Sequence, residues 1–386
     1  MKVSAFVYPW DVNGDPDAAR RIARLGVQQV TLAAAYHSTR ALTPRHPRHR
    51  VVTAEHASVL YPADERRWRG RRLRPYAAGD WAPGDAYGEA AAALADAGLD
   101  VHTWVVLAHN SRLGADHPDT SVRNAYGDRY PWAPCIAQPA TRAYLTDLAA
   151  EAATRPGASG TELESLGWYG LAHLHAHDKT AGVGLGEAGQ YLMSLCFCPA
   201  CAQGYEQQGV ANADLAAAVR AALEPLWRGH EVDDGWPTVE KLLGADTAAA
   251  TRAHRDATAR SLQEAAVAAV REAAPPGFHV LLHADPVPYH CGANAGVDPA
   301  HVLSVADGVV VPCTGGADLV RPFAAQGRGV VAANLTVVRG MGGSPGTLAE
   351  DARAARDLGA HELRLYHAGL ASDADLAAVT EALTRI

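Results

Sequence analysis

The sequence predicts an α/β fold of the (β/α)8 TIM barrel type, and three observations support this prediction. First, eight short runs of apolar or β-branched residues alternate with Ala-rich helical stretches along the 386 residues. Second, several of these runs are continuously apolar, as in parallel strands that are buried on both faces. Third, no change of composition divides the chain, and its length suits a barrel that carries insertions.

The eight predicted strands follow one another in chain order. They lie at 3–10, 27–36, 100–109, 162–170, 278–286, 307–313, 329–338 and 361–369. Helices are predicted between them, for example at 15–26, 86–100 and 346–360, where Asp or Pro often opens the segment and Gly closes it. A doubly wound open sheet is the alternative fold, but the first strand–helix turn, YPWDVNGDPD, lacks the Gly-rich fingerprint of dinucleotide-binding proteins.

Two long insertions interrupt this alternation, and both leave the C-terminal end of a predicted strand. One follows the second strand, spans 37–85 and is rich in Arg, Pro and Trp. The other follows the fourth strand, spans 171–277, is helical and contains a cluster of cysteines. We expect residues 1–386 to form one barrel domain that carries both insertions. Barrel enzymes build their active sites at this end of the strands, so the insertions are expected to border such a site.

The composition argues against several classes of partner. The formal net charge is -8, whereas a nucleic-acid partner would require clustered Lys and Arg. The basic stretch RHPRHR at 45–50 lies among prolines and is interpreted as a solvated or substrate-facing loop. No apolar run approaches the roughly 20 residues of a membrane span, and the first residues, MKVSAFVYPWD, lack the features of a signal peptide. We therefore expect a cytoplasmic protein with no nucleic-acid or membrane partner, and the Ala-rich helices at 211–275 offer a surface for a homo-oligomer.

Three of the six cysteines form the motif C-x-C-x-x-C in LCFCPAC, at Cys196, Cys198 and Cys201. In a reducing compartment, clustered thiols bind metal or carry out redox chemistry more often than they form structural disulfides. Three thiols are too few for a closed tetrahedral metal site, so a fourth ligand is expected elsewhere. The remaining cysteines are Cys135, Cys291 and Cys313. A redox-active pair, metal-free thiols and an iron–sulfur cluster are the alternatives, although the spacing differs from that of common iron–sulfur motifs.

Two segments, CIAQPATR (135–142) and CFCPAC (196–201), resemble the glycoside hydrolase family 42 β-galactosidases. Those enzymes carry a lone Cys ahead of a helix after strand 3 and a C-x-C-x-x-C motif after strand 4. The four cysteines bind zinc in that family, so the resemblance implies that Cys135, Cys196, Cys198 and Cys201 are zinc ligands. Four thiolates leave no open coordination position, which is typical of a structural rather than a catalytic zinc. Such a site would hold the strand-4 insertion against the strand-3 loop.

Polar and aromatic residues gather at the predicted C-terminal ends of the strands. Aromatic faces beside carboxylates suit a sugar, because its C–H face stacks on a ring while its hydroxyl groups form hydrogen bonds. We therefore predict a site that binds a small carbohydrate. The predicted substrate-binding residues are Trp10, Asp11, Tyr36, His37, His109, Trp168, His175, His177, His283, Tyr366 and His367.

The fourth predicted strand carries two carboxylates, Glu162 and Glu164, on the same face, because side chains alternate along a strand. Glu164 is nearer the C-terminal end and is the predicted general acid. In the resembling family the acid/base Glu also ends strand 4, within an Asn-Glu pair, whereas here Leu163 precedes Glu164. Glu187, in GLGEAG, is a rival, but it is interpreted as a residue in the first turn of a helix.

The seventh predicted strand, GVVAANLTVV, contains no carboxylate. Retaining glycosidases of the resembling clan place a nucleophilic Glu at the end of that strand, so a covalent mechanism through this position is excluded. A second carboxylate is therefore predicted to activate a water molecule, as in inverting enzymes. The candidates are Asp285, Asp178 and Asp11.

Three functions compete on this basis. The favoured one is a carbohydrate-active, glycoside hydrolase-like enzyme that acts on a small glycoside or oligosaccharide by carboxylate acid/base chemistry. The second is a metal-dependent hydrolase or lyase, with a second metal held by Asp and by some of His37, His109, His173, His175, His177, His283 and His367. The third is a sugar-binding barrel without catalytic activity.

Overall fold

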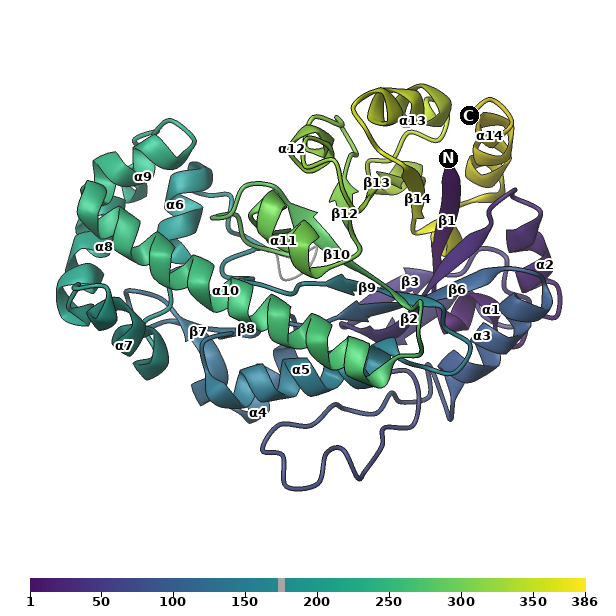
Figure 1. Ribbon diagram of the computed structural model, residues 1–386, viewed down its shortest axis with the longest axis horizontal. Helices are drawn as coiled ribbons and strands as arrows, with labels where there is room; N and C mark the ends of the chain where they lie inside the picture. Colours follow the sequence, from purple (N-terminus) through teal and green to yellow (C-terminus); the bar gives the residue numbers. More distant parts are fainter. Residues whose placement is uncertain (173–177) are drawn as a thin grey trace.

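The computed structural model describes residues 1–172 and 178–386, and it confirms the predicted barrel (Figure 1). The barrel strands are β1 (Lys2–Val7), β2 (Gln29–Tyr36), β6 (Asp100–Val106), β9 (Gly160–Glu164), β10 (His279–Asp285), β12 (Gly308–Pro312), β13 (Val330–Thr336) and β14 (Glu362–Tyr366). All eight are parallel to their neighbours, and the sheet closes because β1 pairs with both β2 and β14.

Helices connect the strands along the outside of the barrel. They are α1 (Pro9–Val12), α2 (Ala18–Ala23), α3 (Ala86–Asp96), α4 (Ser111–Asp116), α5 (Pro139–Ala153), α11 (Pro299–Val305), α12 (Val320–Ala324), α13 (Leu348–Asp357) and α14 (Asp373–Leu383). The helices predicted at 15–26, 86–100 and 346–360 correspond to α2, α3 and α13, and each is shorter than predicted. The fourth strand also ends earlier than predicted, because Ser165 adopts a left-handed conformation with φ of 58° and turns the chain directly after Glu164.

The strand registers arrange the side chains inside the barrel in layers. Near the floor, Arg364 of β14 donates from Nε to Glu162 Oε1 of β9 at 2.7 Å, and both side chains are fully buried. Above this ion pair, the Phe6 ring meets the Trp104 ring edge to face at 4.7 Å and the His283 ring at 5.7 Å. The buried pair therefore supports an aromatic layer, and the C-terminal ends of the strands lie above that layer.

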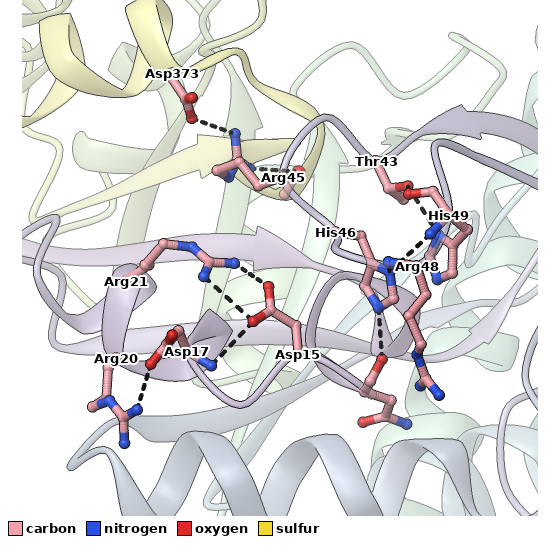
Figure 2. A network of polar contacts seen from close by, with 12 residues as sticks. Asp15, Asp17, Arg20, Arg21, Thr43, Arg45, His46, Arg48, His49 and Asp373 are labelled. Atoms are coloured by element: carbon pink, nitrogen blue, oxygen red, sulfur yellow. Dashed lines mark hydrogen bonds and ion pairs between the residues drawn. The ribbon is translucent and has the colours of Figure 1, made fainter.

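The insertion after β2 begins with the hairpin of β3 (Thr39–Leu42) and β4 (Val51–Ala54). The loop between these strands contacts the segments that follow β1 and β14 (Figure 2). Arg45 donates to backbone carbonyls in 368–371, and its guanidinium lies 3.8 Å from Asp373. His46 is buried, and its Nε2 lies 2.9 Å from the backbone carbonyl of Asn13. The stretch 45–50 is a loop as predicted, and Arg48 and Arg50 are exposed, whereas Arg45 and His46 anchor it to the protein.

The insertion after β9 is helical, as predicted, and extends the molecule to one side of the barrel (Figure 1). It contains α6 (Gly186–Met193), α7 (Pro199–Gln207), α8 (Asn212–Trp227), α9 (Trp236–Leu243) and α10 (Ala245–Ala273). The 29-residue helix α10 returns the chain to β10 and packs along α5, where Arg142 donates to the Thr258 carbonyl at 3.1 Å and to Ser261 Oγ at 3.0 Å. Within residues 1–172 and 178–386, every helix is too short or too polar to cross a membrane.

Smaller strands complete the rim. They are β5 (Ser58–Val59), which pairs with β2, the hairpin of β7 (Ser121–Arg123) and β8 (Arg129–Pro134), and β11 (Ala295–Gly296) beside β10. The hairpin β7–β8 follows β6, so it belongs to the strand-3 loop that was predicted to meet the strand-4 insertion. The backbone N–H of Phe197 donates to the Arg123 carbonyl at 2.7 Å, which joins the two segments.

The buried ion pair gives a direct test of the barrel interior. Arg364→Ala leaves the Glu162 carboxylate without its main partner in the barrel floor, so we expect it to lower the free energy of unfolding by about 3–5 kcal/mol. Urea unfolding followed by Trp fluorescence measures this change. Arg20→Ala is the control, because Arg20 pairs with Asp17 at the exposed surface, and we expect it to cost less than about 1 kcal/mol. Equal effects of the two substitutions would contradict the layered interior.

Candidate active site and metal centre

Glu164 is the last residue of β9, and its side chain is enclosed at the C-terminal end of the barrel. It is 3% exposed, and the Trp104 indole N–H donates to its Oε2 at 2.7 Å. His283 Nδ1 lies 3.9 Å from the same oxygen. The left-handed conformation of Ser165 turns the backbone out of the barrel directly after Glu164, so the Glu164 carboxyl group lies at the C-terminal end of the strand.

Burial controls the protonation of this carboxyl group. Loss of solvent raises the pKa of Glu164 to about 7, and the hydrogen bond from Trp104 opposes that rise only in part. Burial, together with the charge of Arg364, lowers the pKa of His283 to about 3. Near neutral pH, Glu164 therefore keeps a proton in a substantial fraction of molecules, beside an imidazole that carries no charge. That is the state required of a general acid.

Glu162, on the same face of β9, has a different environment. Its Oε1 accepts from Arg364, and His102 Nδ1 lies 3.8 Å from that oxygen. Burial raises the pKa of Glu162, and the charge of Arg364 opposes that rise. Glu162 therefore belongs to the ion pair of the barrel floor, whereas Glu164 lies two residues further along β9, at the C-terminal end of the barrel.

Tyrosine hydroxyl groups surround Glu164. Burial and then the charge of Glu164 raise the pKa values of Tyr36 and Tyr366 above the ordinary range, which places both phenols near the carboxyl group. Tyr8 Oη donates to Tyr36 Oη at 2.9 Å and lies 3.0 Å from His367 Nδ1. His367, like Ser165, is a left-handed residue directly after a barrel strand, with φ of 62°. Backbone strain of this kind concentrates at functional sites.

The second and third loops add histidines to this group. The His37 ring stacks on Tyr36 at 4.1 Å and meets the His109 ring at 5.1 Å, and His109 stacks on Tyr169 at 4.3 Å. Burial, then Glu164 and then Asp178 raise the pKa of Tyr169, so both carboxylates lie near this phenol. Tyr8 and Tyr169 were not predicted as site residues from the sequence, although each lies close to a predicted strand end.

Three predicted residues have other contacts. Trp10 is 4% exposed and its ring stacks on that of Tyr8 at 4.7 Å, so it packs behind Tyr8 and supports the position of that side chain. Asp11 accepts from the backbone N–H of Tyr8 at 2.9 Å, and its carboxylate lines a cleft with Arg45 and Gly369. Trp168 belongs to the interface with the helical insertion.

The Trp168 ring packs against α10. Its indole N–H donates to the Arg255 carbonyl at 3.0 Å, and the Arg255 guanidinium lies 4.7 Å from the centre of the ring. The predicted residues His175 and His177 lie outside the described residues. The predicted catalytic residue Asp178 is described, and its charge acts on Tyr169.

Asp285, the last residue of β10, faces a cleft of about 230 Å³ at the same end of the barrel. Its Oδ1 accepts from the backbone N–H of Val287 at 2.8 Å, and its Oδ2 lies 3.1 Å from His290 Nδ1. His290 Nε2 lies 3.6 Å from Glu187 Oε1. Glu187 is in the first turn of α6, as predicted, and it also accepts from the Tyr289 hydroxyl at 3.1 Å.

The four predicted metal ligands converge. Cys135 follows β8, Cys196 and Cys198 connect α6 to α7, and Cys201 is in the first turn of α7. Cys135 Sγ lies 3.6 Å from both Cys198 Sγ and Cys201 Sγ, and the four sulfur atoms all lie within 4.8 Å of one another. All four side chains are buried, so the cluster forms a closed group of sulfur atoms that fits a metal ion. Cys291 and Cys313, the other candidates for the fourth ligand, lie outside this group.

The fold of this chain resembles that of several glycoside hydrolases of known structure. No protein-family model and no curated protein matches the chain. Among solved structures, it resembles the α-L-fucosidase isoenzyme 2 from Paenibacillus thiaminolyticus, with a TM-score of 0.59, 12% identity, and coverage of 99% of this chain and 48% of that one. The glycoside hydrolase domain of PgaB from Bordetella bronchiseptica has a TM-score of 0.55 and 15% identity, over 99% of this chain and 97% of that domain.

The family 42 enzymes are also among the similar structures. The β-galactosidase Gan42B from G. stearothermophilus has a TM-score of 0.55 and 13% identity, over 99% of this chain and 56% of that one. The chain therefore spans about half the length of the fucosidase and of Gan42B. At these identities the comparison confirms the fold-level resemblance to family 42 and to other glycoside hydrolases with barrel folds.

The raised pKa of Glu164 predicts a pH-dependent stability. The folded state holds a proton that the unfolded state releases between about pH 4.5 and pH 7, so this group destabilises the wild type as pH rises through that window. Glu164→Gln removes the effect. We expect the variant to gain on the order of 3 kcal/mol relative to wild type between pH 5 and pH 8, as measured by chemical unfolding at both values.

Glu264→Gln is the control for this measurement, because Glu264 is exposed and pairs with His301 at the surface. We expect its stability relative to wild type to differ little between the two pH values. A difference for Glu164→Gln that does not change with pH would contradict the buried, protonated carboxyl group.

Proposed function

We propose that this protein is a glycoside hydrolase that cleaves a small glycoside or oligosaccharide with Glu164 as general acid. The observation that carries the proposal is the environment of that carboxyl group, whose pKa is raised to about 7 by burial at the C-terminal end of a (β/α)8 barrel. A glycosidic bond breaks when its leaving oxygen takes a proton, and a carboxylic acid protonated near neutral pH supplies it. The fold, which is also that of known glycoside hydrolases, supports the same assignment.

We assign the second carboxylate to Asp285. The register of β9 and β10 pairs Leu163 with Leu282 and thus sets His283 beside Glu164, so Asp285 is two residues further along the neighbouring strand. With a rise of about 3.3 Å per residue and a strand spacing of about 4.8 Å, the Cα atoms of Glu164 and Asp285 are about 8 Å apart. Inverting hydrolysis requires carboxyl groups roughly 6.5–9.5 Å apart with a water molecule between them, and Cα atoms at this spacing allow the two side chains to reach that separation.

Asp178 is the second candidate for the water-activating role. Its charge and that of Glu164 both act on Tyr169, so this phenol lies near both carboxylates. Asp11 is not proposed, because its carboxylate caps α1 and lines the cleft with Arg45. In this proposal Tyr36, His37, His109, Tyr366 and His367 contact the sugar, since their rings and polar atoms gather around Glu164.

We also propose that the four-cysteine cluster holds one structural zinc ion. Zinc–sulfur bonds of about 2.3 Å in a tetrahedron require sulfur–sulfur separations of about 3.8 Å. The 3.6 Å separations of Cys135 Sγ from Cys198 Sγ and Cys201 Sγ support this geometry. Zinc would supply a crosslink between the loop after β8 and the helical insertion, and the four thiolates leave it no position for substrate.

The metal-dependent alternative requires a second metal site. Among residues 1–172 and 178–386, the cysteine cluster is the single group of three or more His, Cys, Asp or Glu side chains with ligand atoms close enough to share an ion. His175 and His177 lie outside that description. Activity measured with and without a chelator therefore separates the glycoside hydrolase from the metal-dependent enzyme.

The proposed activity is tested on a panel of aryl glycosides. We expect Glu164→Gln to lower kcat/KM by about 10²–10⁴-fold, because a general acid contributes a factor of this size. Wild-type kcat should fall as pH rises above about 7, where Glu164 loses its proton. Asp285→Asn and Asp178→Asn, with Glu264→Gln as the surface control, identify the second carboxylate. Full activity of Glu164→Gln would refute the proposal.

The product anomer, followed by NMR, tests the mechanism separately. We expect inversion, since water attacks in one step on the face opposite the leaving group. Retention would show that another group forms a covalent intermediate. Loss of activity in a chelator that leaves the cluster zinc in place would favour the metal-dependent alternative.

The zinc proposal has its own measurement. We expect one zinc per chain by elemental analysis after dialysis. Cys135→Ser should lower both the zinc content and the stability, the latter on the order of 4 kcal/mol, because a closed site loses a ligand. Cys313→Ser is the matched control, since Cys313 is also buried but lies outside the cluster. Unchanged zinc content in Cys135→Ser would contradict the assignment.

A further inference from the structure

The helical insertion contains a buried arginine that makes no ion pair with a carboxylate in the described part of the chain. Arg255 of α10 is 3% exposed, and its guanidinium lies 4.7 Å from the centre of the Trp168 ring and 5.1 Å from that of Tyr191. Its Nη1 donates to the Ser194 carbonyl at 3.0 Å, and its Nε has no hydrogen-bond partner among the described residues. A buried cation in this state favours an anion next to it.

The ionisable group that Arg255 does contact is a thiol. Arg255 Nη2 lies 2.9 Å from Cys291 Sγ, a short distance for a hydrogen bond to sulfur. Cys291 is partly exposed, and it lines the cleft of about 230 Å³ that also contains Asp285 and Glu187. The sulfur atom therefore has the buried guanidinium on one side and the open cleft on the other.

The other charged groups of the cleft, two carboxylates and one imidazole, neutralise one another only in part. His290 lies between Asp285 and Glu187, at 3.1 Å and 3.6 Å. Burial alone would lower the pKa of His290, but the hydrogen bond and charge of Asp285, followed by Glu187, raise it above its ordinary value. The protonated imidazole thus balances part of the negative charge of the two carboxylates, while the guanidinium of Arg255 is directed to the sulfur.

We propose that Cys291 is a modification site, whose sulfur beside the Arg255 guanidinium reacts with low-molecular-weight disulfides. In this reaction the Cys291 sulfur attacks one sulfur of the disulfide, a new S–S bond forms, the original S–S bond breaks, and one thiolate leaves. The remaining cysteines of the chain do not compete for the adduct. Four belong to the buried cluster, and Cys313 is buried at the end of β12. The product is therefore a mixed disulfide, reversible by an external thiol.

The adduct would occupy the cleft in front of Asp285. If the proposed function holds, modification of Cys291 also blocks access to the second carboxylate, so the enzyme would be reversibly inhibited. This consequence rests on the proposed function, whereas the reactivity of Cys291 does not. The experiment therefore measures reactivity without any substrate.

The test follows alkylation of the purified full chain by iodoacetamide, with peptide mapping by mass spectrometry. We expect Cys291 to react at pH 7 at least about tenfold faster than an N-acetylcysteine reference, because the Arg255 guanidinium stabilises the negative charge on the attacking sulfur. Oxidised glutathione should add to Cys291 once per chain, and dithiothreitol should remove it.

Variants separate the pair from its surroundings. Arg255→Gln should lower the rate at Cys291 to that of the reference, whereas Arg255→Lys should retain the fast reaction. Cys291→Ser should abolish the fast labelling, and Cys313→Ser should leave it intact. If Arg255→Gln does not fold, the comparison of the wild-type rate with the reference decides by itself. A wild-type rate at Cys291 that does not exceed that of the reference overturns the proposal, even where glycosidase activity is present.

Discussion

The ion pair between Arg364 and Glu162 is the interaction on which the interior of the barrel depends. It joins the last strand to the fourth across the barrel floor, and both side chains are fully buried. Two such charges are costly to bury separately, so each makes the other tolerable only when β9 and β14 are both in place. The aromatic layer of Phe6, Trp104 and His283 rests on this floor. Glu164 is held above it by the indole of Trp104.

The sequence predicts the fold well because the barrel depends on patterns that are local. Continuous apolar runs mark parallel strands, and all eight are present in the order predicted. The cysteine cluster was also predicted, since Cys196, Cys198 and Cys201 are close together in sequence and only a fourth cysteine had to be identified. The resemblance to family 42 identified that ligand as Cys135, and the sulfur atoms meet there.

The positions of individual rim residues were less predictable, because they depend on where the chain turns. Ser165 ends β9 with a left-handed turn, so Trp168 no longer follows the alternation of the strand and packs on α10. Asp11 lies within the proline-initiated helix α1, which its own carboxylate caps by accepting from the backbone N–H of Tyr8. The anchors of the loop at 45–50 lie more than 300 residues away, at 368–371, a separation over which no local pattern carries information.

The closure of the barrel by β14 has a consequence for the order in which the protein is made. Until β14 has been synthesised, β1 has β2 as its neighbour but lacks its other partner, and the carboxylate of Glu162 lacks the guanidinium of Arg364. The Arg45 loop likewise has no carbonyl groups at 368–371 to hold. The barrel of the nascent chain therefore cannot close before β14 has been synthesised, so closure is a late event whatever the order in which the earlier units fold.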